Sequence, residues 1–161
     1  MKFLTTPVYQ WSTRSVLAFS FLFGSVCAAQ TPQSPLLDPA TLIYKLPQDI
    51  KWVADPSGID RATLLGDPTK PGRYIVLARW HAHHISRAHF HPNDRFIVVL
   101  SGTWWVGTGD SGDPNKTVPM PAGSFITHFA NQVHYDGAKD EDCLLEITGE
   151  GPGSSIPYVK K

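Results

Sequence analysis

Two histidines separated by a single residue, His89 and His91, stand near the middle of the sequence, shortly before Arg95. On an extended chain alternate side chains leave the same face, with Cα atoms about 6.6 Å apart, so both imidazoles can converge on one point. Imidazole nitrogen is a common ligand of transition metals. The spacing therefore predicts half of a metal site, carried by a β-strand.

A third histidine, His134, follows a tight turn that begins at Asn131. Its setting of short strands punctuated by glycine is the same as that of the first pair, which makes His134 a candidate third ligand. Three neutral imidazoles suit a divalent transition metal: iron, manganese, nickel, copper or zinc. Availability and geometry decide between these metals more than the ligand type does.

The residues around the histidine pair indicate strands that would hold it in place. The apolar, β-branched run 95–100 predicts a strand against a core, and residues 103–106 predict the return strand of a hairpin turned by Ser101 and Gly102. Trp104 and Trp105 then lie on opposite faces. We expect one indole in the core or in a pocket wall, and the other outward as a contact surface.

Composition indicates one all-β domain. The 161 residues include 14 basic and 14 acidic side chains, and this balance without a basic block argues against nucleic acid or an anionic membrane as partner. With 13 Gly and 14 Pro, and no long apolar pattern of helical period after residue 30, short strands joined by turns are expected.

The N-terminus predicts a secretory signal peptide over residues 1–29. Lys2 and Arg14 precede an apolar run over 15–26, and Ala28 and Ala29 supply a small-residue cleavage site. A run of about a dozen residues is too short to span a bilayer. The mature protein is therefore expected to be secreted or periplasmic, with no membrane attachment after cleavage, and Cys143 would remain as its one, buried thiol.

Four segments result from this reading. Residues 1–29 form the signal peptide, and residues 30–40, rich in Pro, Ser and Gln, are expected to be disordered. Residues 41–150 form the β-domain, and the Gly- and Ser-rich residues 151–161 form a flexible tail.

The histidine pattern, together with Gly102 and Gly123, resembles the cupin superfamily, whose two motifs are G-x5-H-x-H-x3,4-E-x6-G and G-x5-P-x-G-x2-H-x3-N. His89 and His91 match the first histidine pair, and His134 matches the histidine of the second motif. The likeness covers roughly residues 70 to 148. It implies a cupin-like jelly-roll β-barrel, RmlC-like, with the metal on these three histidines.

The sequence departs from the cupin pattern at four positions. His83 replaces the first glycine and Ala138 the final asparagine, whereas Asn131, in Phe-Ala-Asn, replaces a glycine whose left-handed backbone asparagine tolerates. Arg95 replaces the glutamate. A guanidinium has five donors and no acceptor, so Arg95 cannot be a ligand and its charge opposes a nearby cation.

One hypothesis is an enzyme, in which a metal acts on a small anionic, oxygenated substrate as in dioxygenases or isomerases and lyases. Arg95 would pair bidentately with the substrate, and Tyr135 or His128 would carry a proton. Phe90, Phe125, Phe129 and one tryptophan would exclude water.

Two other hypotheses follow from the missing glutamate. The protein could be a non-enzymatic barrel that binds a small ligand or a metal, with His81, His83 and His84, expected in a surface loop, as accessory groups. Alternatively, it could be a metal-free cupin whose histidines and Arg95 form a polar network. The oligomeric state stays open: cupins are often dimers, and an outward Trp104 or Trp105 would fit the interface of a homodimer.

Overall fold

The computed structural model describes residues 37, 38 and 40–160. The predicted signal peptide, 1–29, and most of the segment 30–40 lie outside these residues. The chain divides into a unit of residues 1–41 and a unit of residues 42–161, and the second unit carries the strands of the described chain.

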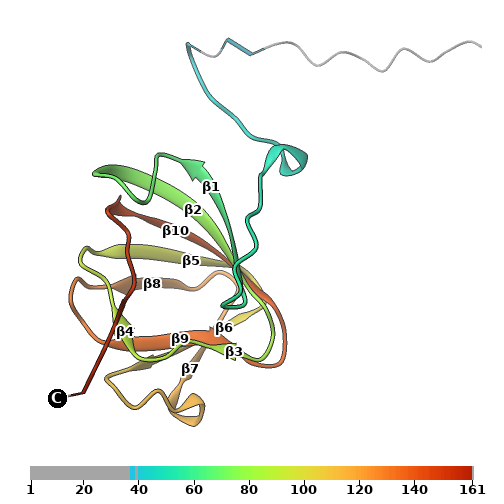
Figure 1. The fold of residues 1–161 in the computed structure, drawn as a ribbon. Helices are drawn as coiled ribbons and strands as arrows, with labels where there is room; N and C mark the ends of the chain where they lie inside the picture. Colours follow the sequence, from blue (N-terminus) through green and yellow to red (C-terminus); the bar gives the residue numbers. More distant parts are fainter. Residues whose placement is uncertain (1–36, 39, 161) are drawn as a thin grey trace, which may run out of the picture. The chain divides into compact units, whose positions relative to one another are not determined.

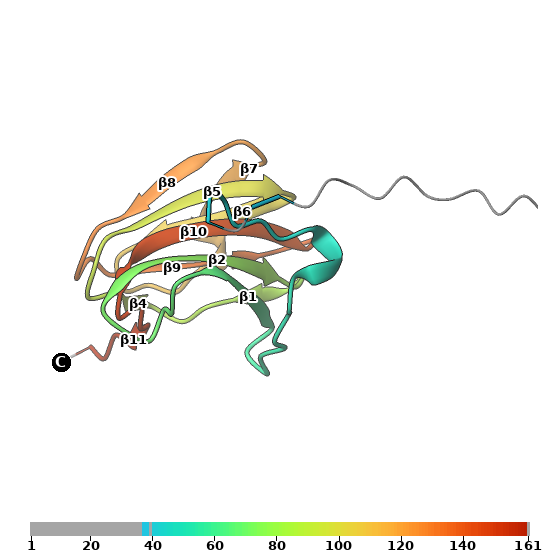
Figure 2. The ribbon, with the colours of Figure 1, turned by 90° about the horizontal axis from the view of Figure 1, so that it is seen from above.

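The second unit consists of two antiparallel sheets. Its first sheet has the order β1-β2-β10-β5-β8, and Figure 1 shows these five strands one below the other. Their bounds are Ile59–Leu65 (β1), Gly72–Trp80 (β2), Cys143–Gly151 (β10), Arg95–Ser101 (β5) and Phe125–His128 (β8). Figure 2 shows the same succession from above.

The second sheet has the order β11-β4-β9-β6-β7, and β3 also pairs with β9. Its strands are His84–Ile85 (β3), His89–Phe90 (β4), Thr103–Thr108 (β6), Val118–Pro121 (β7), His134–Ala138 (β9) and Ile156–Pro157 (β11). Two short 3₁₀ turns complete the described elements, Pro47–Asp49 and Pro114–Lys116. The predicted all-β jelly-roll barrel is confirmed.

The core lies between the two sheets and follows the two-residue period of the strands. Ile97 and Val99 of β5 are 1% exposed, whereas Phe96 and Leu100 on the other face are 45% exposed. Trp104 enters the same core from the second sheet, so the prediction of an inward indole is confirmed for this residue.

The prediction of a hairpin at Ser101-Gly102 is wrong. β5 and β6 follow one another in the sequence but belong to different sheets, so the chain changes sheets at Gly102. Gly102 has a φ of 70°, and a Cβ there would meet the backbone carbonyl of Asp142. A sharp corner between sheets and a hairpin turn need the same glycine, which is why the sequence does not separate them.

The prediction of a flexible tail from residue 151 is also corrected. Ile156 and Pro157 form β11 beside β4, and the backbone N–H of Tyr158 donates to the carbonyl of Ala88 at 2.9 Å. In Figure 1 this C-terminal segment crosses alongside β4. The ordered domain therefore extends beyond Glu150.

Cys143 is 1% exposed, and burial raises the pKa of its thiol to about 12, as expected for an inert core thiol. Among the described residues there is no helix with the length and apolar character needed to cross a bilayer.

His81 joins three parts of the barrel at its surface. Its Nε2 lies 3.0 Å from Oδ2 of Asp60 in β1, and its Nδ1 lies 3.3 Å from Oδ2 of Asp142, before β10. The hydrogen bond to Asp60, followed by that to Asp142, raises the pKa of His81. His83 and His84 are exposed, so the three accessory histidines form no common site in the described chain.

Replacement of Leu145 by Ala is expected to destabilise the domain strongly. Leu145 is fully buried at the centre of the first sheet, and removing its side chain leaves a cavity that costs about 2–5 kcal/mol. The measurement is denaturant unfolding of both forms. Leu65→Ala is the control, because Leu65 is 47% exposed on edge strand β1 and should cost about 0.5 kcal/mol or less. Equal losses in the two variants would contradict the described core.

The contribution of His81 to stability is expected to depend on pH. Because its pKa is raised in the folded state, the stabilisation is complete below the unfolded pKa of about 6.5 and is lost as pH rises through the folded value. The difference in melting temperature between wild type and His81→Gln should therefore be larger at pH 6 than at pH 9. Arg79, whose Nη1 lies 4.0 Å from Asp60, keeps its charge across this range. A difference that does not change with pH would contradict the ion pairs.

Candidate metal centre

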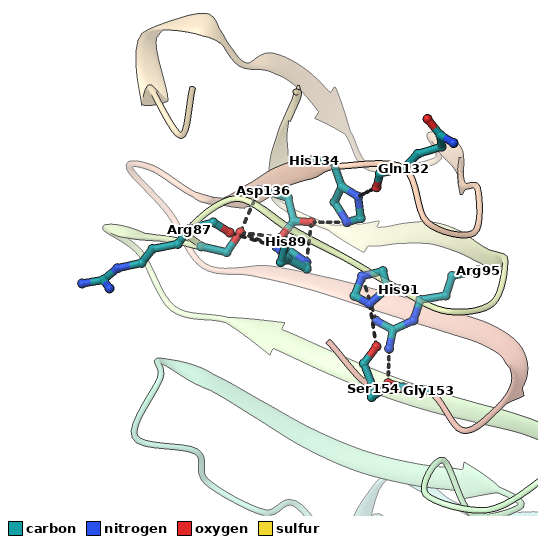
Figure 3. Close-up of polar contacts among 10 residues, drawn as sticks. Arg87, His89, His91, Arg95, Gln132, His134, Asp136, Gly153 and Ser154 are labelled. Atoms are coloured by element: carbon teal, nitrogen blue, oxygen red, sulfur yellow. Dashed lines mark hydrogen bonds and ion pairs between the residues drawn. The ribbon is translucent and has the colours of Figure 1, made fainter. Parts of the chain in front are cut away.

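The fold brings the three predicted histidines together. His89 in β4 and His134 in β9 are directly paired across the two strands, and His91 follows two residues after His89 on the same face. The ring centroids are 4.4 Å apart for His89 and His134, 4.9 Å for His89 and His91, and 5.0 Å for His91 and His134. All three side chains are buried, and each offers a nitrogen within 4.8 Å of the other two (Figure 3).

Backbone carbonyls fix the tautomer of each histidine. The Nδ1 atoms lie 2.9 Å from carbonyl oxygens, His89 from Arg87, His91 from Ser154 and His134 from Gln132. A carbonyl can only accept, so each Nδ1 carries the proton and each Nε2 carries a lone pair. Metal-bound histidines have this arrangement, in which the second ring nitrogen donates to a carbonyl or a carboxylate.

His91 and His134 are neutral at pH 7, which is the form that binds metals. Burial lowers the pKa of His91 to about 3, with the charge of Arg95 as the second cause, and burial lowers the pKa of His134 to about 4. The Nε2 of His134 is buried without a hydrogen-bond partner among the described residues. A buried lone pair of this kind requires a cation or a donor.

Asp136 completes the cluster and was not predicted from the sequence. It lies two residues after His134 on the same face of β9, and its Oδ2 is 3.6 Å from Nε2 of His134 and 4.0 Å from Nε2 of His89. Burial raises the pKa of Asp136, and its backbone N–H donates to Oγ of Ser86 at 3.0 Å. The signal in the sequence is the spacing His134-x-Asp136, which repeats that of His89-x-His91.

The Asp136 carboxylate and the Nε2 atoms of His89 and His134 are spaced like ligands of a divalent ion. Ligand atoms around a tetrahedral ion with bonds of about 2.1 Å are about 3.4 Å apart, close to the separations between the Asp136 carboxylate and the two Nε2 atoms. A carboxylate and two lone pairs that face one another repel unless a positive charge lies between them. Three imidazoles and one carboxylate are a common ligand set for transition metals.

Arg95 lies beside this cluster on β5. Its Nη1 is 3.3 Å from Nε2 of His91, its Nη2 donates to the carbonyl of Gly153, and its Nε is buried without a partner. In the described part of the chain, no carboxylate oxygen lies within 4.0 Å of the guanidinium. Burial lowers the pKa of Arg95, but an arginine keeps its charge in proteins. It is thus a half-buried cation without an acidic partner among the described residues.

The two predicted proton carriers have different positions. His128, at the end of β8, lies with its ring centroid 3.7 Å from that of His134, and burial lowers its pKa to about 2. Tyr135 points to the other face of β9, where it accepts a hydrogen bond from Ser111 Oγ at 2.9 Å and lies against Gly107. The prediction of Tyr135 as a proton carrier is therefore wrong, because neighbours in a strand face opposite sides.

The predicted water-excluding residues also need correction. Phe125 is 65% exposed and Phe129 is 63% exposed, and neither they nor Phe90 lines the cavity beside the cluster. Trp104 does line it. Arg87 contributes its carbonyl to His89, whereas its side chain points away from the histidines in Figure 3.

A cavity of about 760 Å³ opens beside the histidines, between the two sheets. His89, His91, His128, Asp136 and Arg95 are among the polar groups on its wall, and the apolar part of the wall includes Val76, Ala78, Trp80, Ile97, Trp104 and Ile147. Residues 152–155 of the C-terminal segment close one side. Such a cavity suits an organic molecule with an apolar body and a polar group directed to the cluster.

Facing antiparallel sheets with a buried histidine cluster between them define a cupin barrel. A family model described as the ChrR cupin-like domain matches residues 41–152, so this chain belongs to that family. No curated protein sequence matches the chain at a significant level.

Solved structures with the same fold include the polyketide cyclase RemF from Streptomyces resistomycificus, at 16% identity and a TM-score of 0.61 over 74% of this chain and 87% of that one. An RmlC-like cupin from Shewanella frigidimarina gives 13% identity and a TM-score of 0.54 over 67% and 90%. A structure of the DMSP lyases RdDddP and RnDddQII gives 14% and 0.55 over 69% and 63%. At these identities the likeness shows the fold alone.

Removal of the C-terminal segment after Pro152 is expected to destabilise the domain by about 2 kcal/mol or more. The truncation deletes the carbonyls that accept from Arg95 and from His91, and an unpartnered buried charge is costly. It also uncovers the apolar cavity. Thermal unfolding and binding of the dye ANS measure both effects.

The matched control ends after Tyr158 and keeps β11. It loses the exposed ion pair between Lys160 and Asp110, whose contribution is small. If both truncations behave like the full chain, the C-terminal segment has no part in forming the site.

Proposed function

We propose that the protein binds a divalent transition metal through His89, His91 and His134, with Asp136 as the fourth ligand. The observation that carries this proposal is the convergence of three Nε2 lone pairs, each fixed by an Nδ1–H that donates to a backbone carbonyl. The donor set suits iron, manganese, nickel, copper or zinc. When bound, such an ion supplies Lewis acidity and, if it is redox-active, activation of dioxygen.

The proposed substrate is a small oxygenated anion. Arg95 is a half-buried cation without an acidic partner in the described chain, so a carboxylate or enolate at this end of the cavity would gain a charge-assisted, bidentate contact. The apolar walls would take up the rest of the molecule and exclude water. His128, whose Nε2 is buried without a hydrogen-bond partner in the described chain, is the proposed proton carrier, although burial, which lowers its pKa to about 2, makes it a weak base.

The reaction class we propose is dioxygenation with a redox-active ion, or isomerisation or elimination with a redox-silent one. The structural neighbours named as a polyketide cyclase and as DMSP lyases act on small molecules, which supports a small-molecule substrate. Their identities are too low to transfer any one reaction.

A second candidate function is a cupin that binds a small anion without metal chemistry. The contact between Arg95 Nη1 and His91 Nε2 favours it, because the lone pair of His91 is then already engaged in a hydrogen bond.

Export to the periplasm or the medium, directed by residues 1–29, and a homodimer remain proposals. Trp105, the predicted outward indole, is only partly exposed and lies under the ammonium of Lys139, 3.7 Å from its ring centroid.

Elemental analysis of the untagged protein, purified without chelators, is expected to find close to one metal ion per chain. The double variant His89→Ala/His91→Ala should lose the metal and all turnover that depends on it, since two of three imidazole ligands are gone. Replacing the exposed pair His83 and His84 by Ala provides the control and should leave the metal content unchanged.

Metal retained in the double variant would overturn this site. A wild type that is free of metal and cannot be reconstituted would favour the second candidate function, with Arg95 at the centre of an anion site. Turnover that survives complete removal of the metal would exclude the metal-dependent enzyme.

A further inference from the structure

Arg95 and the proposed metal need the same atom, Nε2 of His91. We propose that Arg95 donates a hydrogen bond to this lone pair while no metal is bound, and releases it when an organic anion binds to the guanidinium. The anion and the metal would then bind cooperatively. This inference rests on the proposed function, because it requires His91 to be a metal ligand. It adds a mechanism by which the anionic ligand controls loading of the metal.

His91 has only one lone pair to offer. Its Nδ1 donates to the carbonyl of Ser154 at 2.9 Å, which leaves Nε2 as an acceptor. The Nη1 of Arg95 lies 3.3 Å from this Nε2, within hydrogen-bond distance. A guanidinium is only a donor, so the contact uses the lone pair that a metal would use. While it persists, the metal is left with His89, His134 and Asp136 as ligands.

Arg95 donates to His91 because no stronger acceptor lies within reach of its Nη1 in the described chain. Its Nη2 has the carbonyl of Gly153, its Nε has no partner, and in the described chain no carboxylate oxygen reaches within 4.0 Å. An anion adds Coulomb attraction between opposite charges to the hydrogen bond from the guanidinium, which a neutral imidazole does not. An anion in the cavity is therefore a better partner for Nη1 than the imidazole.

The cavity defines the class of anion. Arg95 lies on its wall together with Tyr74, whose hydroxyl is buried without a hydrogen-bond partner and can also donate to an oxyanion. The remaining walls are mainly apolar, and the cavity holds about 760 Å³. The ligand that would draw Arg95 away is a carboxylate or enolate on an apolar, preferably aromatic, body.

Coupling of this kind is reciprocal. If the anion frees His91 for the metal, the metal strengthens binding of the anion by the same factor. Without Arg95 the competition disappears, and the metal should bind tightly in the absence of any anion.

The test is a titration of the metal-free protein with Co²⁺ at constant ionic strength, followed by its visible absorption, with and without benzoate. Wild type should bind Co²⁺ about tenfold more tightly with benzoate. Arg95→Met should bind Co²⁺ about tenfold more tightly than wild type without benzoate, and benzoate should no longer change its affinity. Benzamide, which is neutral and of the same shape, should have no effect on either.

Arg73→Met is the matched control. Arg73 is exposed, pairs with Glu150 and does not line the cavity, so this variant should behave like wild type. Arg95→Gln serves as a second substitution if Arg95→Met does not fold, as judged by circular dichroism.

Equal Co²⁺ affinity of wild type and Arg95→Met without benzoate overturns the inference, and so does a benzoate effect that persists in Arg95→Met. These results leave the proposed metal site intact. If neither protein binds Co²⁺ under any of these conditions, the proposed function itself is overturned, and the inference with it.

Discussion

The register between β4 and β9 is the constraint on which the site depends. It places His89 directly opposite His134, and the two-residue period of a strand then brings His91 and Asp136 to the same face. A slip of one residue in this pairing would turn the side chains of one strand to the other face, and so separate His89 and His91 from His134 and Asp136. The short strand β4 is fixed by β9 on one side and by β11 on the other, so the C-terminal segment takes part in setting this register.

The sequence predicts the parts of the structure that follow from side-chain period and residue chemistry. The all-β class, the inward Trp104 and the three histidines came from these rules, and the left-handed φ of 61° at Asn131 agrees with the asparagine that replaces a glycine of the cupin pattern. Asp136 followed the same rule and could have been found, because a residue two positions from a candidate ligand shares its face.

What the sequence could not predict depends on backbone atoms far apart in the chain. The carbonyls of Gly153 and Ser154 accept from Arg95 and His91, yet a Gly- and Ser-rich segment has the composition of a loose tail. The corner at Gly102 needs the same residue type as a hairpin turn. In both cases the interacting residue lies far away in the sequence, so the local sequence does not predict the contact.

The distribution of charge around the cluster differs from the cupin pattern. At the position of the glutamate in the first motif, on β5, stands the cation Arg95, while a carboxylate, Asp136, lies on β9. The negative charge next to the histidines is thus kept, but its place in the fold has changed. The positive charge next to it gives the cavity a polar end that attracts anions, which a glutamate in this position would repel.

The carbonyls that orient the three histidines belong to the backbone of Arg87, Gln132 and Ser154. Substituting these residues changes their side chains and leaves the accepting oxygens in place. The tautomers of the ligands are therefore protected from most point mutations in the surrounding shell, in contrast to sites where an aspartate or a glutamate fixes the imidazole. Residues lining the cavity could diverge toward new ligands while the geometry of the histidine cluster is inherited unchanged.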